Sequence, residues 1–177
     1  TEYDIYGRPQ RSIGTLRATG QEQDAELHVA LNSGIPLSLA DGGFLFVFQT
    51  GRPQFQRYDA RGHLQYERRV EGRELDRHLR SLPARWPRRV VGERDIPLVT
   101  PTVRAATVSP NGHLWLSFVV PIVYEYDEDG DKVRALQLEA AGVLAPTSLA
   151  FTPGGRLLVT PGLFEFIVSD SSPRAFR

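Results

Sequence analysis

The sequence contains no cysteine, no methionine and a single lysine, Lys132, beside 20 arginines. Without cysteine the chain can form neither a disulfide nor a thiolate metal site, and both a reducing and an oxidising compartment are permitted on that ground. We attribute the shortage of lysine to genomic base composition. The lack of methionine fits a processed or partial chain, and Thr1 fits either removal of an initiator methionine or cleavage from a longer precursor.

Long hydrophobic runs are absent as well. The longest, Phe44 to Phe48 and Trp115 to Ile122, are far shorter than the roughly 20 residues that a membrane-spanning helix needs, so membrane insertion is not expected. No signal peptide is visible, although a mature chain would already have lost one. The formal net charge is zero, which argues against a surface built throughout to hold nucleic acid or anionic lipid.

The sequence does contain two interleaved sets of hairpin turns. The first set has the frame Tyr-Asp-x-x-Gly and occurs at Tyr3 to Gly7, Tyr58 to Gly62 and Tyr126 to Gly130. Aspartate suits such a turn because its side chain can bond the backbone that follows, and glycine accepts a positive φ. Strand-like residues flank the frame, so each copy predicts an extended segment, a tight turn and a second extended segment.

The second set places a glycine turn before a run of apolar, β-branched or aromatic residues. Its members are LADGGFLFVF (Leu39 to Phe48), VSPNGHLWLSF (Val108 to Phe118) and FTPGGRLLVT (Phe151 to Thr160). This pattern is typical of a strand that follows a hairpin turn. The two sets lie 18 to 20 residues apart, so each pair of hairpins predicts a four-stranded unit.

The units recur with the period of propeller blades. The distance from Gly112 to Gly155 is 43 residues, within the roughly 40 to 50 of a four-stranded blade. Residues 71–100 form an insertion that lengthens the preceding interval. Leucines 75, 79 and 82 have helical spacing and predict a short amphipathic helix that Pro83 ends. A second helix is expected from Gln21 to Leu31, and no linker divides residues 1–177 into domains.

These turns and strands resemble NHL-type and related six-bladed β-propeller proteins of bacteria. The resemblance implies an all-β fold of four-stranded antiparallel blades around an axis, with short helical insertions between blades and binding surfaces on the loops at one end. The repeats account for about three blades, and Gly162 to Asp170 is expected to begin a further outer hairpin. We consider three explanations: a longer chain, two copies that complete a ring, and a partner protein that covers the open side.

An acidic turn is the first candidate site. It carries Glu125 and Glu128 together with Asp127, Asp129 and Asp131. Carboxylates around a glycine turn can supply the converging oxygens that Ca²⁺ requires, so Asp127, Asp129 and Asp131 are candidate calcium ligands. The alternative is a solvated hairpin tip, because YDARG makes the same bend without the charge and the EF-hand pattern is not completed. No other metal or cofactor is expected.

A basic cluster in the insertion is the second candidate site. Its residues are Arg77, Arg80, Arg85, Trp86, Arg88 and Arg89. Arginines with an interleaved aromatic residue can dock an acidic protein face, or grip phosphates and stack on a base. The alternative is a solvated insertion balanced by nearby acids. We favour protein docking or intramolecular packing over nucleic acid, because the net charge is zero and no nucleic-acid motif is present.

Residues that would indicate catalysis are few. No nucleophile elbow and no phosphate-binding glycine loop occurs. None of the four histidines pairs with another at zinc-site spacing, and His63 and His113 each follow a turn glycine, so we interpret both as hairpin residues. Phe44, Phe46 and Phe48 alternate with period two, and we expect them to line one sheet face and pack between blades, with Trp115 in the matching place of the next blade.

The resulting hypothesis is a noncatalytic protein-binding or scaffold module. We expect an accessory subunit that docks on a larger, membrane-associated assembly at an extracytoplasmic location, with another protein or a second copy covering the open blade face. The alternative is a six-bladed propeller enzyme such as a calcium-assisted lactonase or lyase. A weaker alternative is nucleic-acid binding through the arginines of the insertion.

Overall fold

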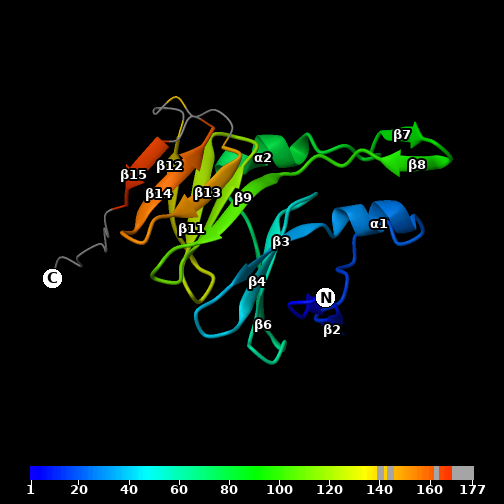
Figure 1. The fold of residues 1–177 in the computed structure, drawn as a ribbon. Coiled ribbons are helices and arrows are strands. Elements are labelled where there is room, and N and C mark those ends of the chain that lie inside the picture. Colours follow the sequence, from blue (N-terminus) through cyan, green and yellow to red (C-terminus); the bar gives the residue numbers. More distant parts are fainter. Residues whose placement is uncertain (139–141, 143–145, 162–163, 169–177) are drawn as a thin grey trace.

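The chain folds into three antiparallel sheets and two separate hairpins, shown for a computed structural model in Figure 1. The structure describes residues 1–138, 142, 146–161 and 164–168, so the hairpin expected from Gly162 to Asp170 lies partly outside the described residues. The described strands are β1 (Glu2–Tyr3), β2 (Pro9–Arg11), β3 (Gly34–Ser38), β4 (Phe44–Phe48), β5 (Gln54–Tyr58), β6 (Leu64–Arg69), β7 (Arg88–Val91), β8 (Arg94–Pro97), β9 (Val103–Val108), β10 (Leu114–Phe118), β11 (Ile122–Tyr126), β12 (Lys132–Gln137), β13 (Ser148–Phe151), β14 (Arg156–Thr160) and β15 (Phe164–Ile167).

Each sheet follows the order of its strands in the chain. The first sheet is β3-β4-β5-β6, the second is β9-β10-β11-β12, and the third has the described strands β13-β14-β15. The first strands of the sheets are neighbours, because β9 contacts both β3 and β13. The all-β prediction is therefore confirmed: four-stranded antiparallel sheets succeed one another in the manner of propeller blades.

The repeated Asp-x-x-Gly turns have one common geometry. In each turn the aspartate carboxylate accepts two backbone N–H groups, two and four residues further on, at 2.8 to 3.1 Å. The aspartates are Asp4, Asp59 and Asp127, and the glycine of each turn has a positive φ. The second and third turns join β5 to β6 and β11 to β12, whereas the first joins β1 to β2, which form a two-stranded sheet of their own.

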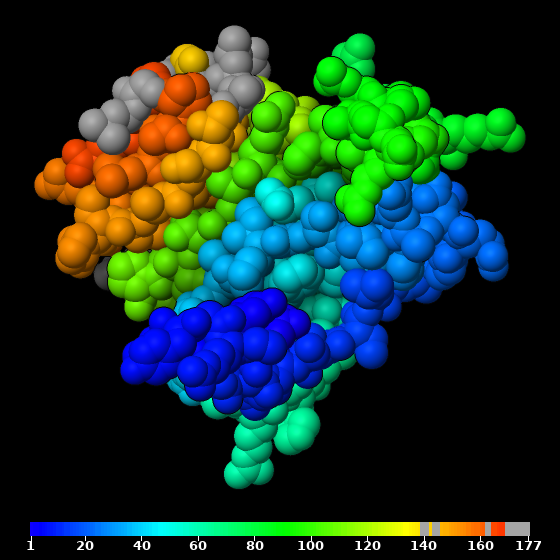
Figure 2. All heavy atoms as spheres, turned by 45° about the vertical axis from the view of Figure 1, so that its right-hand side comes forward, coloured from blue at the N-terminus to red at the C-terminus, as the bar shows by residue number. Residues whose placement is uncertain are grey.

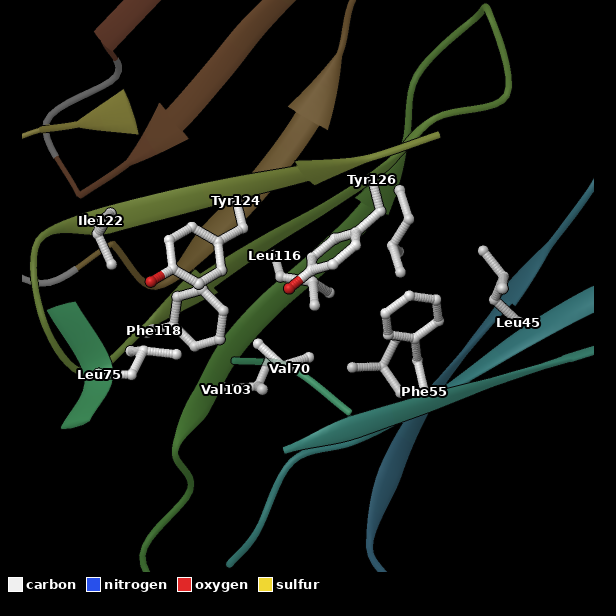
Figure 3. Close-up of a cluster of buried hydrophobic side chains, with 12 residues drawn as sticks. Leu45, Phe55, Val70, Leu75, Val103, Leu116, Phe118, Ile122, Tyr124 and Tyr126 are labelled. Carbon is white, nitrogen blue, oxygen red and sulfur yellow. The ribbon is translucent and has the colours of Figure 1, made fainter. Parts of the chain in front are cut away.

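Two hydrophobic cores lie on opposite faces of the second sheet. The first core joins this sheet to the first sheet and includes Leu45 and Phe55 from one side and Leu116 and Tyr124 from the other (Figure 3). The second core joins it to the third sheet around Trp115 and includes Leu149, Leu157 and Val159. The alternation of β10 explains this division, because successive residues of a strand point to opposite faces.

The three phenylalanines of β4 do line one face, but the expectation that they pack between blades is wrong. The first core receives Leu45 and Val47 of this strand instead. On the opposite face, Phe44 stacks on Tyr58 with 4.8 Å between the ring centroids, and Phe46 packs edge to face against Phe48. Both faces of β4 are apolar, so the alternation of its side chains does not predict which face packs against the next sheet.

Trp115 packs between blades as expected, but it does not occupy the place of a β4 phenylalanine. Counted from the equivalent turn glycines, Gly42 and Gly112, it corresponds to Leu45. Leu114, two residues beyond Gly112, corresponds to Phe44 and packs in the first core, toward the preceding sheet. The phenylalanine face of β4 is therefore the face that a preceding blade would cover.

The chain's own N-terminal segment covers part of that face. Arg17 lies 4.4 Å from the ring centroid of Phe48, and a Cβ on Gly14 would come within 2.6 Å of the Tyr58 hydroxyl. Phe48 and Tyr58 are consequently 3% and 6% exposed. The dark blue residues in Figure 2 lie against the blue and teal atoms of the first sheet. The open side is thus partly closed from within the chain.

Two short helices complete the described structure. Helix α1 (Ala25–Leu31) begins later than the predicted Gln21, because Asp24 caps it by accepting the backbone N–H of Leu27. Helix α2 (Arg73–Arg80) lies in the predicted insertion and ends before Pro83. Neither helix, nor any other described part of the chain, forms a helix long and apolar enough to cross a membrane.

Candidate functional site

The insertion at residues 71–100 folds into helix α2 and the β7–β8 hairpin, which we call the arm (Arg88–Pro97). Leu75 of α2 is fully buried in the first core, and Leu79 packs against it, as their helical spacing predicts. The arm extends beyond the sheets and lies above α1 (Figure 1). The insertion therefore has one end fixed in the core and one end projecting from the body of the molecule.

Polar contacts also hold α2 on the second sheet. The Tyr124 hydroxyl donates a hydrogen bond of 2.7 Å to Glu74, and Lys132 Nζ donates one of 2.9 Å to the Glu71 carbonyl. The same ammonium lies 4.4 Å from the Tyr124 ring centroid. The bond from Tyr124 lowers the pKa of Glu74, while burial raises the pKa of Tyr124. The one lysine is thus used to fasten the base of the insertion.

The six residues of the predicted basic cluster do not share one face. Four arginines have exposed side chains, two of them on α2, one after it and one on β7: Arg77, Arg80, Arg85 and Arg89. Trp86 is half-buried and lines a cleft at the base of the arm. Arg88 is engaged in ion pairs. The sequence pattern therefore identified the insertion, but it did not indicate which of these residues are exposed, which line the cleft and which form ion pairs.

Arg88 anchors the arm to α1. Its guanidinium bonds Asp24 at 2.5 Å and Asp95 at 2.7 Å, and a third carboxylate, Glu26, lies at 3.4 Å. The hydrogen bond that Arg88 donates to Asp95 and the charge of Asp24 raise the pKa of Arg88. A two-stranded hairpin is only marginally stable alone in water, so these contacts help to keep the arm folded where it projects.

The opposite face of the arm is apolar and basic. Register places Arg89 beside Ile96 and Val91 beside Arg94, so these four side chains share a face that points away from the Arg88 contacts. Val91 is 52% and Ile96 38% exposed. Among the residues that the structure describes, neither Arg89 nor Arg94 pairs with a carboxylate.

The acidic turn between β11 and β12 contacts the first sheet. The Glu128 carbonyl accepts hydrogen bonds from Arg57 at 2.8 Å and from the Tyr66 hydroxyl at 3.1 Å, and the Asp129 carbonyl accepts one from Arg68 at 3.0 Å. A Cβ on Gly130 would come within 2.9 Å of Tyr66 and Arg68. The turn therefore packs closely against side chains of the neighbouring blade.

The calcium hypothesis for Asp127, Asp129 and Asp131 stays a prediction. The Asp127 carboxylate is occupied by the backbone of its own turn. No group of three or more histidine, aspartate or glutamate side chains in the described residues is placed to hold a metal ion. A calcium titration that follows the melting temperature tests the hypothesis, with Asp129→Asn as the variant that should lose any rise.

Of the four histidines, only His113 bonds a buried carboxylate in the described part of the chain. His63 is exposed and lies 3.2 Å from Asp59 in its own turn, as the hairpin interpretation expects. His28 meets the Thr19 hydroxyl at 2.7 Å, and His78 is half-buried near Thr102. Burial lowers the pKa of His78. His113 differs, because its ring bonds a buried carboxylate.

Glu125 forms the centre of a buried ionic cluster that the sequence did not predict. Its side chain is only 3% exposed and contacts His113 at 2.7 Å and the guanidinium of Arg134. Arg134 also lies 5.4 Å from the Trp115 ring centroid, beside the second core. The sequence offered one signal of this cluster, a glutamate within the otherwise apolar and aromatic strand Ile122–Tyr126. In the structure, the strand register brings Glu125 opposite Trp115.

Comparison with known proteins adds little beyond this geometry. No protein-family model and no curated protein matches the sequence. Solved structures do match: the WD40 β-propeller domain of Doa1 aligns at 13% identity and a TM-score of 0.42, covering 71% of this chain and 32% of that one. A protein of unknown function from Bacteroides caccae aligns at 16% identity and a TM-score of 0.42, covering 70% of this chain and 37% of that one.

The chain thus spans about a third of the length of these two structures. Neither likeness is close enough to carry an argument about activity. A propeller-like fold rests on the sheets described above, and NHL type stays a prediction.

Proposed function

We propose that this chain is a noncatalytic protein-binding module that docks on a larger assembly through its arm. The observation that carries the proposal is the outward face of β7 and β8, where Val91 and Ile96 stand exposed between Arg89 and Arg94. The buried centre of a protein interface is more apolar than the rest of the surface, and arginine is enriched in interfaces. Of the residues predicted to dock a protein, the proposed interface retains Arg89, and it adds Val91, Arg94 and Ile96.

The anchoring of the arm supports the same proposal. Exposed apolar side chains on a loose hairpin would lose conformational entropy on binding, whereas Arg88 already holds this hairpin against α1 through Asp24 and Glu26. An accessory role and an extracytoplasmic location belong to the same hypothesis. They rest on the resemblance to bacterial propellers and on the lack of cysteine.

The test is affinity capture with purified baits that differ at one place. The arm variant carries Val91→Asp and Ile96→Asp, and the matched control carries Ile5→Asp, an exposed apolar residue in the β1–β2 turn. We expect a protein captured in stoichiometric amount by the native chain and the control, but not by the arm variant. Direct binding of that purified protein then confirms the contact.

Two results would overturn the proposal. One is equal capture by all three baits, which would place the interface elsewhere. The other is a monodisperse monomer that captures no protein under any condition in which it is folded. Circular dichroism of the arm variant establishes folding, and little change is expected because both substituted side chains are exposed.

A further inference from the structure

A cleft with a volume of about 560 Å³ lies at the base of the arm. It is lined by the N-terminal segment around Arg17 and Thr19 and by the start of β5 and the end of β6. The end of α2 and the turn that follows it, from Leu79 to Trp86, also line it. Pockets that bind ligands usually measure roughly 300 to 1,000 Å³, so this cleft has room for several residues of a peptide.

The charges that line the cleft are mostly positive. Three arginines, Arg17, Arg52 and Arg69, face a single carboxylate residue, Glu71. They divide into two kinds. Arg17 donates hydrogen bonds to the carbonyls of Leu31, Thr50 and Arg52 at 2.7 to 2.9 Å, so its guanidinium shapes the cleft and is not available to a ligand.

Arg52 and Arg69 are available. Both side chains are exposed, and neither forms an ion pair with a carboxylate in the part of the chain that the structure describes. They lie near one another because Arg69 pairs in register with Gln54, two residues after Arg52. A guanidinium presents a planar fork that matches a carboxylate, so two such groups favour a ligand with more than one carboxylate.

The segment from the end of α2 to Trp86 gives the cleft an apolar lining. Leu79, Leu82, Pro83 and Trp86 line it, and Trp86 is half-buried, so part of its ring faces the cleft. An aromatic ring of this kind binds an apolar side chain and excludes water from it. The cleft therefore combines two cationic groups with apolar side chains in its lining.

We infer that the cleft binds an acidic peptide segment of a partner protein, with carboxylates on Arg52 and Arg69 and an apolar side chain against Trp86. The inference rests on the proposed protein-binding function and adds a second contact to the arm. A peptide fits better than nucleic acid, because a strand of phosphates needs a longer run of cations and the chain as a whole has no net charge.

The experiment measures binding of the blocked hexapeptide acetyl-Glu-Glu-Leu-Phe-Glu-Glu-amide by tryptophan emission. Of the two tryptophans, Trp115 is 1% exposed in the second core, so a change on binding reports Trp86. We expect saturable binding that weakens at least about tenfold when glutamine replaces every glutamate of the peptide, since each charged hydrogen bond is worth about a factor of ten. Trp86→Phe should abolish the emission change.

Charge reversal locates the site. Arg52→Glu with Arg69→Glu should weaken binding by at least about tenfold. The matched control is Arg8→Glu with Arg61→Glu, which makes the same charge change in the β1–β2 turn and in the β5–β6 turn, neither of which lines the cleft. Both control arginines are exposed. Binding by the control variant should stay within about twofold of the native value, because surface charges beyond a Debye length are screened.

Four outcomes overturn the inference: no saturable binding, equal weakening by the control, tighter binding of a ten-residue oligothymidine, and full displacement by glutarate at the peptide's own concentration. The last would indicate a site for a small dicarboxylate. Failure here is distinguishable from failure of the proposed function. Capture through the arm with no peptide binding removes only the cleft, and peptide binding without any arm-dependent capture removes only the arm.

Discussion

Single polar side chains fasten the described segments together. Arg17 is the clearest case, because one guanidinium bonds the end of α1 and two carbonyls of the β4–β5 connection, while lying on the ring of Phe48. Burial of this group lowers its pKa, a cost that the three carbonyls offset. The order of the N-terminal segment over the first sheet depends on contacts of this kind.

Replacing Arg17 should therefore destabilise the protein more than its position in a loop suggests. We expect Arg17→Ala to lower the free energy of unfolding by about 2 kcal/mol, because carbonyls that it satisfies lose a charged donor. Urea unfolding measures the change. Arg52→Ala is the control, with an expected effect within about 0.5 kcal/mol, and equal effects of the two variants would contradict the role of Arg17.

The Glu125 cluster gives a second prediction for a single residue. Glu125→Gln should cost about 3 kcal/mol, because it removes the charge that Arg134 and His113 share in a buried place. Glu165→Gln offers the comparison, since Glu165 pairs with Arg156 at the surface and should contribute less than about 1 kcal/mol. Thermal unfolding of both variants in one buffer distinguishes them, and a similar loss in both would rule out the buried cluster as a major source of stability.

At the level of elements, α2 joins the insertion to the first core. Leu75 is 0% exposed, so Leu75→Ala should lower the free energy of unfolding by about 3 kcal/mol, the usual loss for a buried leucine. Arg77→Ala on the exposed side of the same helix should change it by less than about 0.5 kcal/mol. A small effect at Leu75 in urea unfolding would mean that α2 is only loosely docked.

The same helix predicts a dependence on pH. The pKa of His78 is lowered by burial, so the unfolded state binds the proton more readily. The contribution of neutral His78 is fully present above the unfolded pKa of about 6.5 and is lost as the pH falls from there through the folded pKa. The native protein should consequently lose stability between pH 7.5 and pH 5 more steeply than His78→Gln. Urea midpoints at three pH values test this, and parallel curves would refute it.

At the level of the whole molecule, the second sheet lies between two cores. Leu75 and Leu157 are both fully buried, yet they lie on opposite sides of this sheet. Since β9 to β12 are common to both cores, we expect one cooperative transition in which Leu75→Ala and Leu157→Ala lower the same midpoint. Tryptophan emission and far-ultraviolet circular dichroism should coincide. Two separated transitions would show that the sheets unfold independently.

The sequence was informative where structure is local. An aspartate that bonds the following backbone and a glycine with positive φ determine a turn within five residues, so the hairpins and the four-stranded units could be predicted. The helix in the insertion followed from the spacing of its leucines. The face chosen by Phe44 could not be predicted, because Leu45 and Val47 made both faces of β4 equally apolar.

The candidate site was harder to predict because its contacts are distant in sequence. Arg88 meets Asp24 across 64 residues, so a cluster of arginines gave no indication of which one is an anchor. The cleft is formed by five separate segments, and among its residues only Trp86 had been predicted as a binding residue. The partnership of His113 with Glu125 required the strand register of β10 and β11, which the sequence does not specify.

The contacts of Lys132 also make the protein convenient for limited proteolysis. This sequence offers a lysine-specific protease one peptide bond, between Lys132 and Val133. The bond lies at the start of β12. Lys132, the first residue of this strand, pairs with Tyr126, and its ammonium group donates a hydrogen bond to the Glu71 carbonyl. Cleavage therefore requires the edge strand to leave its neighbour. Its rate would measure how often the blade opens next to the base of the insertion, and a bound partner at the cleft should slow it.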